Sequence, residues 1–214
     1  MDKREKKLDS KEIYKGKILD LWVDDVLCPN GNKSKREVIR HCKAAAILAF
    51  DIYGKVILED QYRYPYDKII KEIPAGKCDS PEEDPKDTAF RELKEETGYT
   101  AKNLEYLGCI YPSCAYTDEI IYIYMATGLT KGDQKLDPDE TLDFYKVSFN
   151  KLIEMINQGE IQDAKTLAAV YLSLIRNLDL EARTKIIALT LRDFKKITAS
   201  FCSDAVIFSL NTIV

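Results

Sequence analysis

A single helix with clear ends interrupts a chain whose flanking segments have the pattern of strands. Asp84 and Pro85 supply a capping carboxylate and a proline at the first helical position, and Gly98 supplies a C-terminal stop. Between these ends, apolar side chains recur on one side and glutamates on another. A capped helix between strand-rich segments predicts an α/β fold.

Strands are expected on both sides of this helix, where short apolar or β-branched runs end at turn-forming residues. These runs lie within 11–48 and at 55–59, 69–73, 104–111, 119–126 and 142–147, with turns at 29–32 and Gly54. Two more helices are expected after the last strand, because the apolar spacing changes to the helical period. They span 151–158 and 164–176, and the second has a candidate buried stripe of Leu167, Val170, Tyr171 and Leu174.

The composition limits the classes of function. The 214 residues include 36 acidic and 32 basic side chains, for a net charge of −4 at pH 7, whereas a general nucleic-acid binder carries a basic excess. No apolar run reaches the roughly 18–20 residues of a membrane span, and the first residues, MDKREKKLDS, lack the apolar stretch of a secretory signal. We therefore expect a cytoplasmic protein that binds neither nucleic acid nor membrane.

Cysteine and histidine usage narrows the chemistry. The six cysteines include no CxxC pair, and in a cytoplasmic protein they are expected to be free thiols. His41 is the only histidine, so histidine-rich zinc sites are excluded and any Ser-His or Cys-His pair would have to use it. Carboxylates are therefore the expected catalytic groups, and His41 is expected to be structural.

The predicted helix carries three glutamates close together. Glu92 and Glu96 are four residues apart, which stacks their side chains on one face, and Glu95 lies beside them. Ionised carboxylates so close repel one another unless they point into water or share a cation. Oxygen ligands without histidine or thiolate suit Mg²⁺ or Mn²⁺. A solvated acidic surface is the alternative interpretation of this cluster taken alone.

A fixed pattern around these glutamates favours the metal site. The segment matches the second half of the Nudix box at Glu83, Arg91, Glu92, Leu93, Glu95, Glu96 and Gly98. Gly76 is one residue too far from Glu83 for the first half, and Glu82 would restore that spacing but miss the arginine by one. Because a loop can absorb an extra residue and a helix cannot, we align the box on Glu83. The chain thus resembles the Nudix hydrolases.

Further segments resemble the ADP-ribose pyrophosphatase branch of that family. In chain order they are the run from Gly16 through Arg36-Glu37, then Gln61-Tyr62-Arg63, Glu72-Ile73-Pro74-Ala75-Gly76, Ser113, Asp118-Glu119-Ile120-Ile121 and Asp163-Ala164-Lys165-Thr166. The resemblance implies an α/β/α Nudix sandwich with a mixed sheet, preceded by an N-terminal β-rich segment. It also implies Mg²⁺-dependent hydrolysis of ADP-ribose to AMP and ribose 5-phosphate, with Mn²⁺ as an alternative metal, in a homodimer.

The implied organisation has three parts. Residues 1–43 form the N-terminal β-rich segment, which is expected to dimerise, and residues 44–178 form the Nudix hydrolase domain. Residues 179–214 form a C-terminal extension of unassigned role. Helical periodicity over 180–198 and an apolar run over 205–214 favour a packed helix and strand there, and binding of a partner or membrane surface is the alternative.

The resemblance assigns metal-binding and catalytic roles to the helix. Glu92 and Glu96 are the implied principal metal ligands, assisted by Glu95 and by the carbonyl oxygen of Ala75. Glu95 and Arg91 are also placed among the catalytic residues, and Arg91 is expected to brace the helix and orient its glutamates rather than touch substrate.

The remaining implied roles fall outside the helix. Glu140, with Asp139 as second choice, is the acid expected to orient or deprotonate the attacking water, and an acidic surface turn is the alternative. The resemblance also assigns Arg36, Arg63 and Glu72 to substrate binding, and for the two arginines a planar guanidinium suits phosphate. Ordinary strand-surface arginines are the alternative for the first two.

The choice of substrate stays open at this stage. Ser113-Cys114-Ala115 stands where members of the branch usually carry Ser-Pro-Gly, and the loss of proline and glycine changes the stiffness of that loop. Other nucleoside diphosphate sugars and dinucleotides are the nearest alternative substrates. A non-catalytic Nudix-fold nucleotide sensor is the alternative from another class, and the complete set of box glutamates argues against it.

Overall fold

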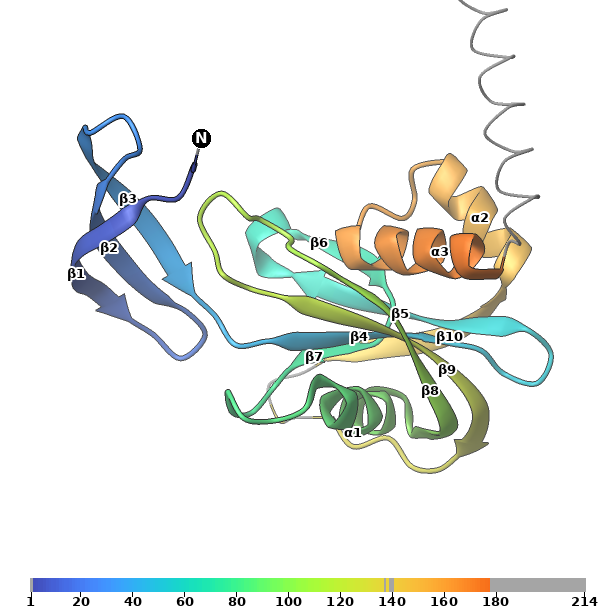
Figure 1. Cartoon of the computed structure of the whole chain (residues 1–214). Helices are drawn as coiled ribbons and strands as arrows, with labels where there is room; N and C mark the ends of the chain where they lie inside the picture. Colours follow the sequence, from blue (N-terminus) through green and yellow to red (C-terminus); the bar gives the residue numbers. More distant parts are fainter. Residues whose placement is uncertain (1, 137, 139–140, 178–214) are drawn as a thin grey trace, which may run out of the picture. The chain divides into compact units, whose positions relative to one another are not determined.

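The computed structural model describes residues 2–136, 138 and 141–177 (Figure 1). The chain divides into two compact units, residues 1–172 and residues 173–214. The helix expected at 180–198, the strand expected at 205–214 and the candidate acids Asp139 and Glu140 lie outside the described residues.

The described elements follow the strand–helix–strand order that the sequence predicts. The strands are β1 (Lys6–Lys15), β2 (Asp20–Leu27), β3 (Lys33–Arg40), β4 (Ala44–Ala49), β5 (Lys55–Arg63), β6 (Lys68–Glu72), β7 (Ala75–Lys77), β8 (Tyr99–Ile110), β9 (Ile121–Lys131) and β10 (Leu142–Ser148). The helices are α1 (Pro85–Thr97), α2 (Phe149–Asn157) and α3 (Ala164–Asn177), with a 3₁₀ turn at Tyr64–Tyr66. The short strand β7 and the 3₁₀ turn were not predicted, because three residues are too few to show a period.

Helix α1 begins and ends where the capping residues predict. The side chain of Asp84 accepts a hydrogen bond from the N–H of Lys86 at 2.9 Å, and Pro85 occupies the first turn. Gly98 has a φ of 72°, and its N–H donates to the carbonyl of Lys94 at 2.8 Å. This left-handed conformation favours glycine. The caps therefore fix which residues of the segment are helical.

The strands form three sheets in the described part of the chain. The first is antiparallel in the order β1-β2-β3, and the second is antiparallel in the order β10-β5-β6. The third has the order β7-β4-β9-β8, in which β4 and β9 are parallel and the other pairs antiparallel. The expected mixed sheet is thus confirmed.

Helices cover both faces of the mixed sheet, with α1 on one face and α2 and α3 on the other (Figure 1). All six residues of β4 are buried, as expected for a strand covered on both faces. Ile47 packs in the cluster that contains Leu93 of α1, whereas Leu48 packs in the cluster that contains Leu152 of α2 and Ala169 of α3. The α/β/α sandwich predicted from the sequence is therefore confirmed.

The N-terminal sheet is more exposed than the sandwich. Strand β1 begins at Lys6, before the expected residue 11. Its first residues pair with β2, with register shifts at Lys7/Asp9 and Glu12/Tyr14, but they are largely charged and show no apolar alternation that would predict a strand. Ile13 and Tyr14 are exposed. The end of β3 reaches the sandwich through a β-bridge between Ile39 and Thr117 and an ion pair between Arg40 and Asp118.

The buried side of α3 differs from the predicted stripe. Leu167 and Val170 pack against the core, but Tyr171 and Leu174 are exposed. The prediction was wrong for these two because it counted only apolar residues, whereas the fully buried Thr166 lies on the inner side. None of the described helices is both long and apolar enough to cross a membrane. The cysteines of the described part of the chain are free thiols, as predicted.

Candidate metal and substrate site

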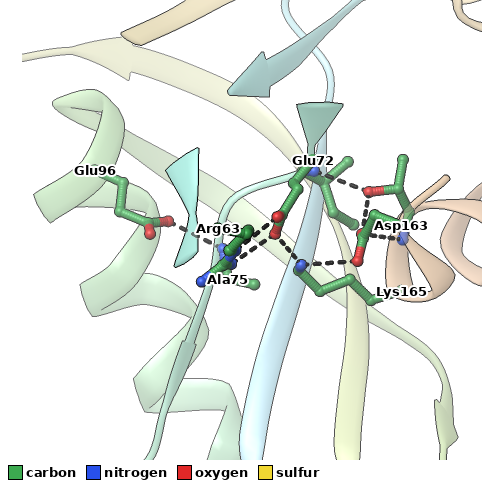
Figure 2. A network of polar contacts seen from close by, with 8 residues as sticks. Arg63, Glu72, Ala75, Glu96, Asp163 and Lys165 are labelled. Carbon is green, nitrogen blue, oxygen red and sulfur yellow. Dashed lines mark hydrogen bonds and ion pairs between the residues drawn. The ribbon is translucent and has the colours of Figure 1, made fainter. Parts of the chain in front are cut away.

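The carboxylates of Glu92 and Glu96 lie next to the two residues that begin β7. Glu96 is buried, and its Oε2 accepts a hydrogen bond from the N–H of Ala75 at 2.9 Å (Figure 2). A Cβ added to Gly76 would come within 2.0 Å of Glu92 Cδ. Only glycine therefore leaves room for the Glu92 carboxylate, and the predicted ligands Ala75, Glu92 and Glu96 are gathered at one place.

Arg91 ties the outer glutamates of α1 to β7. Its Nη1 donates to Glu92 Oε1 at 2.7 Å and to Glu95 Oε2 at 3.0 Å, and its Nη2 donates to the carbonyl of Lys77 at 3.1 Å. Burial alone would lower the pKa of Arg91, but the negative charges of Glu92 and Glu95 outweigh it and raise that pKa above its ordinary value. The guanidinium thus stays charged and is placed to orient both glutamates.

Glu83, rather than Glu82, contacts this arginine. Glu83 Oε1 lies 3.6 Å from Arg91 Nε, and Glu83 Oε2 accepts a hydrogen bond from the N–H of Asp79 at 2.5 Å. That hydrogen bond outweighs the effect of burial and lowers the pKa of Glu83. Glu82 is exposed. The alignment of the box on Glu83 agrees with this geometry, and the extra residue lies in the loop between β7 and α1.

Negative charge exceeds positive charge around Arg91. Its guanidinium lies within 4 Å of four carboxylates, those of Asp79, Glu83, Glu92 and Glu95. The side chain of Glu92 is only 12% exposed, so its charge is poorly solvated. A surplus of carboxylates, of which Glu83 and Glu92 are partly buried, is an environment in which a bound cation is stabilised.

The donor atoms of this cluster suit Mg²⁺ or Mn²⁺. The candidate ligands, namely Glu92, Glu95, Glu96 and the carbonyl of Ala75, offer oxygen only, as hard divalent cations prefer. Within residues 2–136, 138 and 141–177, no three or more histidine, cysteine, aspartate or glutamate side chains converge as a complete metal site. Mg²⁺ needs no such set, because it keeps several waters and takes one or two carboxylates together with substrate phosphate. The residues present therefore fit this ion.

A second polar cluster lies where β5, β6 and the start of α3 meet (Figure 2). Nε and Nη2 of Arg63 each donate to one carboxylate oxygen of Glu72 at 2.7 Å. Lys165 donates to Glu72 Oε2 and, at 3.0 Å, to Asp163 Oδ1. Burial alone would raise the pKa of Glu72, but Arg63 and Lys165 outweigh it and hold that pKa below its ordinary value. The Glu72 carboxylate thus stays charged and fixes the plane of the Arg63 guanidinium.

A cavity of about 380 Å³ lies beside this second cluster, near the lower end of the roughly 300–1,000 Å³ typical of small-molecule sites. Arg63, Glu72, Asp163 and Lys165 line it, and so does Ser113. The substrate-binding candidates Arg63 and Glu72 therefore lie on the wall of one cavity. The loop Ser113-Cys114-Ala115, whose departure from the family pattern left the choice of substrate open, contributes Ser113 to the same wall.

Arg36 does not join either cluster. Its Nε and Nη2 donate to the two carboxylate oxygens of Glu5, at 3.0 and 2.5 Å, and its Nη1 donates to Ser34 Oγ at 2.9 Å. Within the described part of the chain, Arg36 forms hydrogen bonds only with residues of the N-terminal segment. Its predicted role in substrate binding therefore stays a prediction. Glu140 and Asp139 lie outside the described residues.

Asp163 and Lys165 lie in the second cluster, although neither was assigned a role from the sequence alone. A signal for them was present. An aspartate directly before a helix is a typical N-cap, and a lysine in the first turn is electrostatically unfavourable and needs a partner. The identity of that partner, Glu72, was not readable because it lies on a distant strand.

The fold and the site together define the class of this protein. The fold is an α/β/α sandwich, and the site combines an acid-rich helix, the arginine that braces it and a neighbouring cavity. The sequence model of the NUDIX domain matches residues 40–170. The chain belongs to the Nudix family.

The chain is similar to two relatives in sequence and to one solved structure in fold. Over 173 residues the chain is 43% identical to the ADP-ribose pyrophosphatase of Bacillus subtilis (strain 168), covering 79% of this chain and 93% of the relative. The identity and coverage are the same for the methanol dehydrogenase activator of Bacillus methanolicus. A crystal structure described as an ADP compounds hydrolase has a TM-score of 0.71 and 21% identity, covering 79% of this chain and 92% of that one, and shows the same fold.

Proposed function

We propose that this protein hydrolyses the diphosphate of ADP-ribose to AMP and ribose 5-phosphate with the help of Mg²⁺. The observation that carries the proposal is the packing of the Glu92 and Glu96 carboxylates against Ala75 and Gly76, with Arg91 bracing the helix. The 43% identity to an ADP-ribose pyrophosphatase supports ADP-ribose as the substrate.

In the proposed site, Glu92 and Glu96 are the principal metal ligands, and Glu95 and the Ala75 carbonyl assist them. Bound Mg²⁺ offsets charge on the diphosphate and lowers the pKa of a coordinated water. Arg91 has a positioning role, because its contacts go to carboxylates and to the backbone of β7 rather than into the cavity. Mn²⁺ is the alternative ion.

Arg63 is the proposed contact to a substrate oxygen. Its Nε and Nη2 are held by Glu72, while Nη1 donates to no residue of the described ranges. A guanidinium fixed in this way offers its remaining N–H groups without having to be reoriented on binding. Arg36 is the proposed second substrate arginine, and Glu140, with Asp139 as second choice, is the proposed acid that activates water.

The proposal extends to the assembly and location of the chain. Residues 1–43 are the proposed dimerising segment of a homodimer, residues 44–178 the hydrolase domain, and residues 179–214 an extension without an assigned role. Exposed apolar side chains on β1, namely Leu8, Ile13 and Tyr14, support a role of the first sheet in association. The cytoplasm is the proposed location.

The test is a comparison of substrates in the presence of Mg²⁺. Purified protein is incubated with ADP-ribose, other nucleoside diphosphate sugars and dinucleotides, and the products are separated and identified. We expect the highest kcat/KM for ADP-ribose, with AMP and ribose 5-phosphate as products and no turnover after chelation of the metal. A higher kcat/KM for another diphosphate would contradict the substrate and leave the reaction in place. No turnover of any compound would contradict the proposed activity.

A second candidate function is the activation of another enzyme, which the name of the Bacillus methanolicus relative suggests at the same 43% identity. It is tested by adding this protein to a purified methanol dehydrogenase and measuring the dehydrogenase rate. If the wild type increases the dehydrogenase rate and Glu96→Gln does not, activation depends on the same proposed metal ligand as hydrolysis. No increase would remove this candidate.

A further inference from the structure

Lys165 stands where helix electrostatics disfavour a cation. It lies in the first turn of α3, where the aligned peptide dipoles favour negative charge. Its side chain is only 11% exposed, so the ammonium group also loses most of its hydration. Both effects oppose a lysine at this position, and its contacts with other charges must outweigh them.

Those contacts link α3 to the Arg63–Glu72 pair. Lys165 Nζ bridges Glu72 Oε2 and Asp163 Oδ1. Asp163 is itself fixed, because its Oδ2 accepts hydrogen bonds from the N–H of Thr166 at 2.9 Å and from the Thr166 hydroxyl at 2.6 Å. The Glu72 carboxylate is therefore held by Arg63 on one side and by a rigid helix terminus on the other.

The charges of this cluster balance only when Lys165 is counted. Arg63 and Lys165 face Glu72 and Asp163, and all four residues line the same cavity. Without the ammonium group, two carboxylates would share one guanidinium, and the cavity wall, which also carries Lys68, would lose its net positive charge. Such a wall attracts a diphosphate less, and Asp163, freed from Lys165, also becomes a second carboxylate toward which Arg63 can turn.

We propose that Lys165 is a positioning residue that, by bridging Glu72 and Asp163, holds the Arg63 guanidinium toward the cavity and keeps the wall positively charged for an anionic substrate. The proposal rests on the function proposed above. It differs from a purely structural ion pair, whose removal changes stability but not ligand affinity. A positioning role predicts a loss of affinity for diphosphates.

The experiment measures ADP-ribose binding by calorimetry in EDTA, where no metal-dependent turnover occurs. The variants are Lys165→Met, which removes the charge at similar size, Lys165→Gln as a second neutral form, and Lys165→Arg, which keeps the charge. The matched control is Lys146→Met, which breaks another partly buried ion pair, between Lys146 and Asp51 at 3.1 Å, away from the cavity. Circular dichroism verifies that each variant is folded.

We expect Lys165→Met and Lys165→Gln to weaken binding by about tenfold or more, Lys165→Arg to stay within about threefold of wild type, and Lys146→Met within about twofold. With Mg²⁺ and ADP-ribose, the loss in kcat/KM should appear mainly as a higher KM. Binding by folded neutral variants within about twofold of wild type, or a loss equal to that of Lys146→Met, would overturn the proposal.

The two proposals fail in different ways. A wild type that binds ADP-ribose but does not cleave it with Mg²⁺ contradicts the proposed function, and the comparison of variants in EDTA still tests Lys165. Inorganic pyrophosphate serves as the second probe in the same titration. A wild type that binds neither probe overturns the positioning role as well, because that role requires a cavity that accepts a diphosphate.

Discussion

The two polar clusters of this protein differ in their balance of charge. Around Arg91, one guanidinium contacts four carboxylates. At the start of α3, Arg63 and Lys165 face Glu72 and Asp163. A surplus of partly buried negative charge is stabilised by a further cation, whereas a balanced cluster is complete with its own residues. This difference in charge supports the proposed metal site at the first cluster and the proposed substrate-binding role of Arg63 at the second.

The largest expected effect tests the metal assignment of the first cluster. Glu96→Gln keeps an oxygen that can accept the Ala75 N–H, so the fold should persist, while the charge of a principal ligand is lost. We expect kcat to fall about a hundredfold or more, the size of losing one strong transition-state interaction. The measurement is ADP-ribose hydrolysis at saturating Mg²⁺, with circular dichroism to verify folding.

The control for this variant is Glu154→Gln, which makes the same chemical change on α2, where the Glu154 side chain is 63% exposed. It should leave kcat unchanged. If Glu96→Gln keeps wild-type turnover, Glu96 is not a metal ligand. The carboxylates of α1 are then a solvated acidic surface, which is the alternative interpretation of the sequence.

A smaller effect is expected when a side chain at position 76 displaces the Glu92 carboxylate. Gly76→Ala would place a methyl group within 2.0 Å of Glu92 Cδ, so the carboxylate must move. Because a misplacement of about 1 Å at an active site can cost up to about a hundredfold, we expect kcat/KM to fall about thirtyfold. The assay is ADP-ribose hydrolysis over a range of Mg²⁺ concentrations, and a shift to higher Mg²⁺ should accompany the loss.

Gly159→Ala is the comparison for this substitution. Gly159 has a φ of 75° and open space around its Cβ position, so alanine there should destabilise the fold by about 1 kcal/mol without affecting activity. Equal activity of the two alanine variants would show that Glu92 tolerates displacement, and would weaken the distinction between the clusters.

The first cluster could be predicted from sequence because its parts are close together in the chain. The ends of α1 follow from Asp84, Pro85 and Gly98, and the spacing of Glu92 and Glu96 places both on one face. The Nudix resemblance implied that Ala75 lies near these acids, whereas the contact of Glu92 with Gly76 was not predicted, since no local pattern relates β7 to α1.

The second cluster could be predicted only in part, because its members are far apart in sequence. Arg63 and Glu72 were proposed as substrate residues, yet their mutual ion pair depends on the register of β5 against β6. Lys165 and the inward side of Thr166 were missed, because a polar residue on a helix is read as exposed unless its partner is known. The early start of β1 was missed for a related reason, since exposed charged strands have no apolar alternation.

The balanced cluster should also respond to pH in a defined direction. The pKa of Glu72 lies below its ordinary value in the folded protein, so its ionised form stabilises the fold above the unfolded-state pKa, about 4.3. This contribution is lost as the pH falls through the lower, folded-state pKa. Glu72→Gln should therefore reduce the free energy of unfolding by about 2 kcal/mol at pH 7, and the difference from wild type should shrink toward pH 3. Urea unfolding across this range measures it, and a difference that is constant with pH would contradict the assignment.

The smallest expected effect tests whether the two clusters are coupled through the backbone that joins them. The Thr166 hydroxyl accepts the N–H of Ile73 at 3.0 Å, and two residues later the N–H of Ala75 is bound to Glu96. Thr166→Val keeps the shape but removes both the acceptor for Ile73 and the hydroxyl that donates to Asp163, which should reduce the free energy of unfolding by about 1–2 kcal/mol. If the sheet pairing of β7 with β4 holds Ala75 by itself, kcat/KM for ADP-ribose should stay within about threefold of wild type. A loss of activity much larger than this, in a variant that urea unfolding shows to be only slightly destabilised, would mean that the helix terminus of the balanced cluster also sets the position of Glu96.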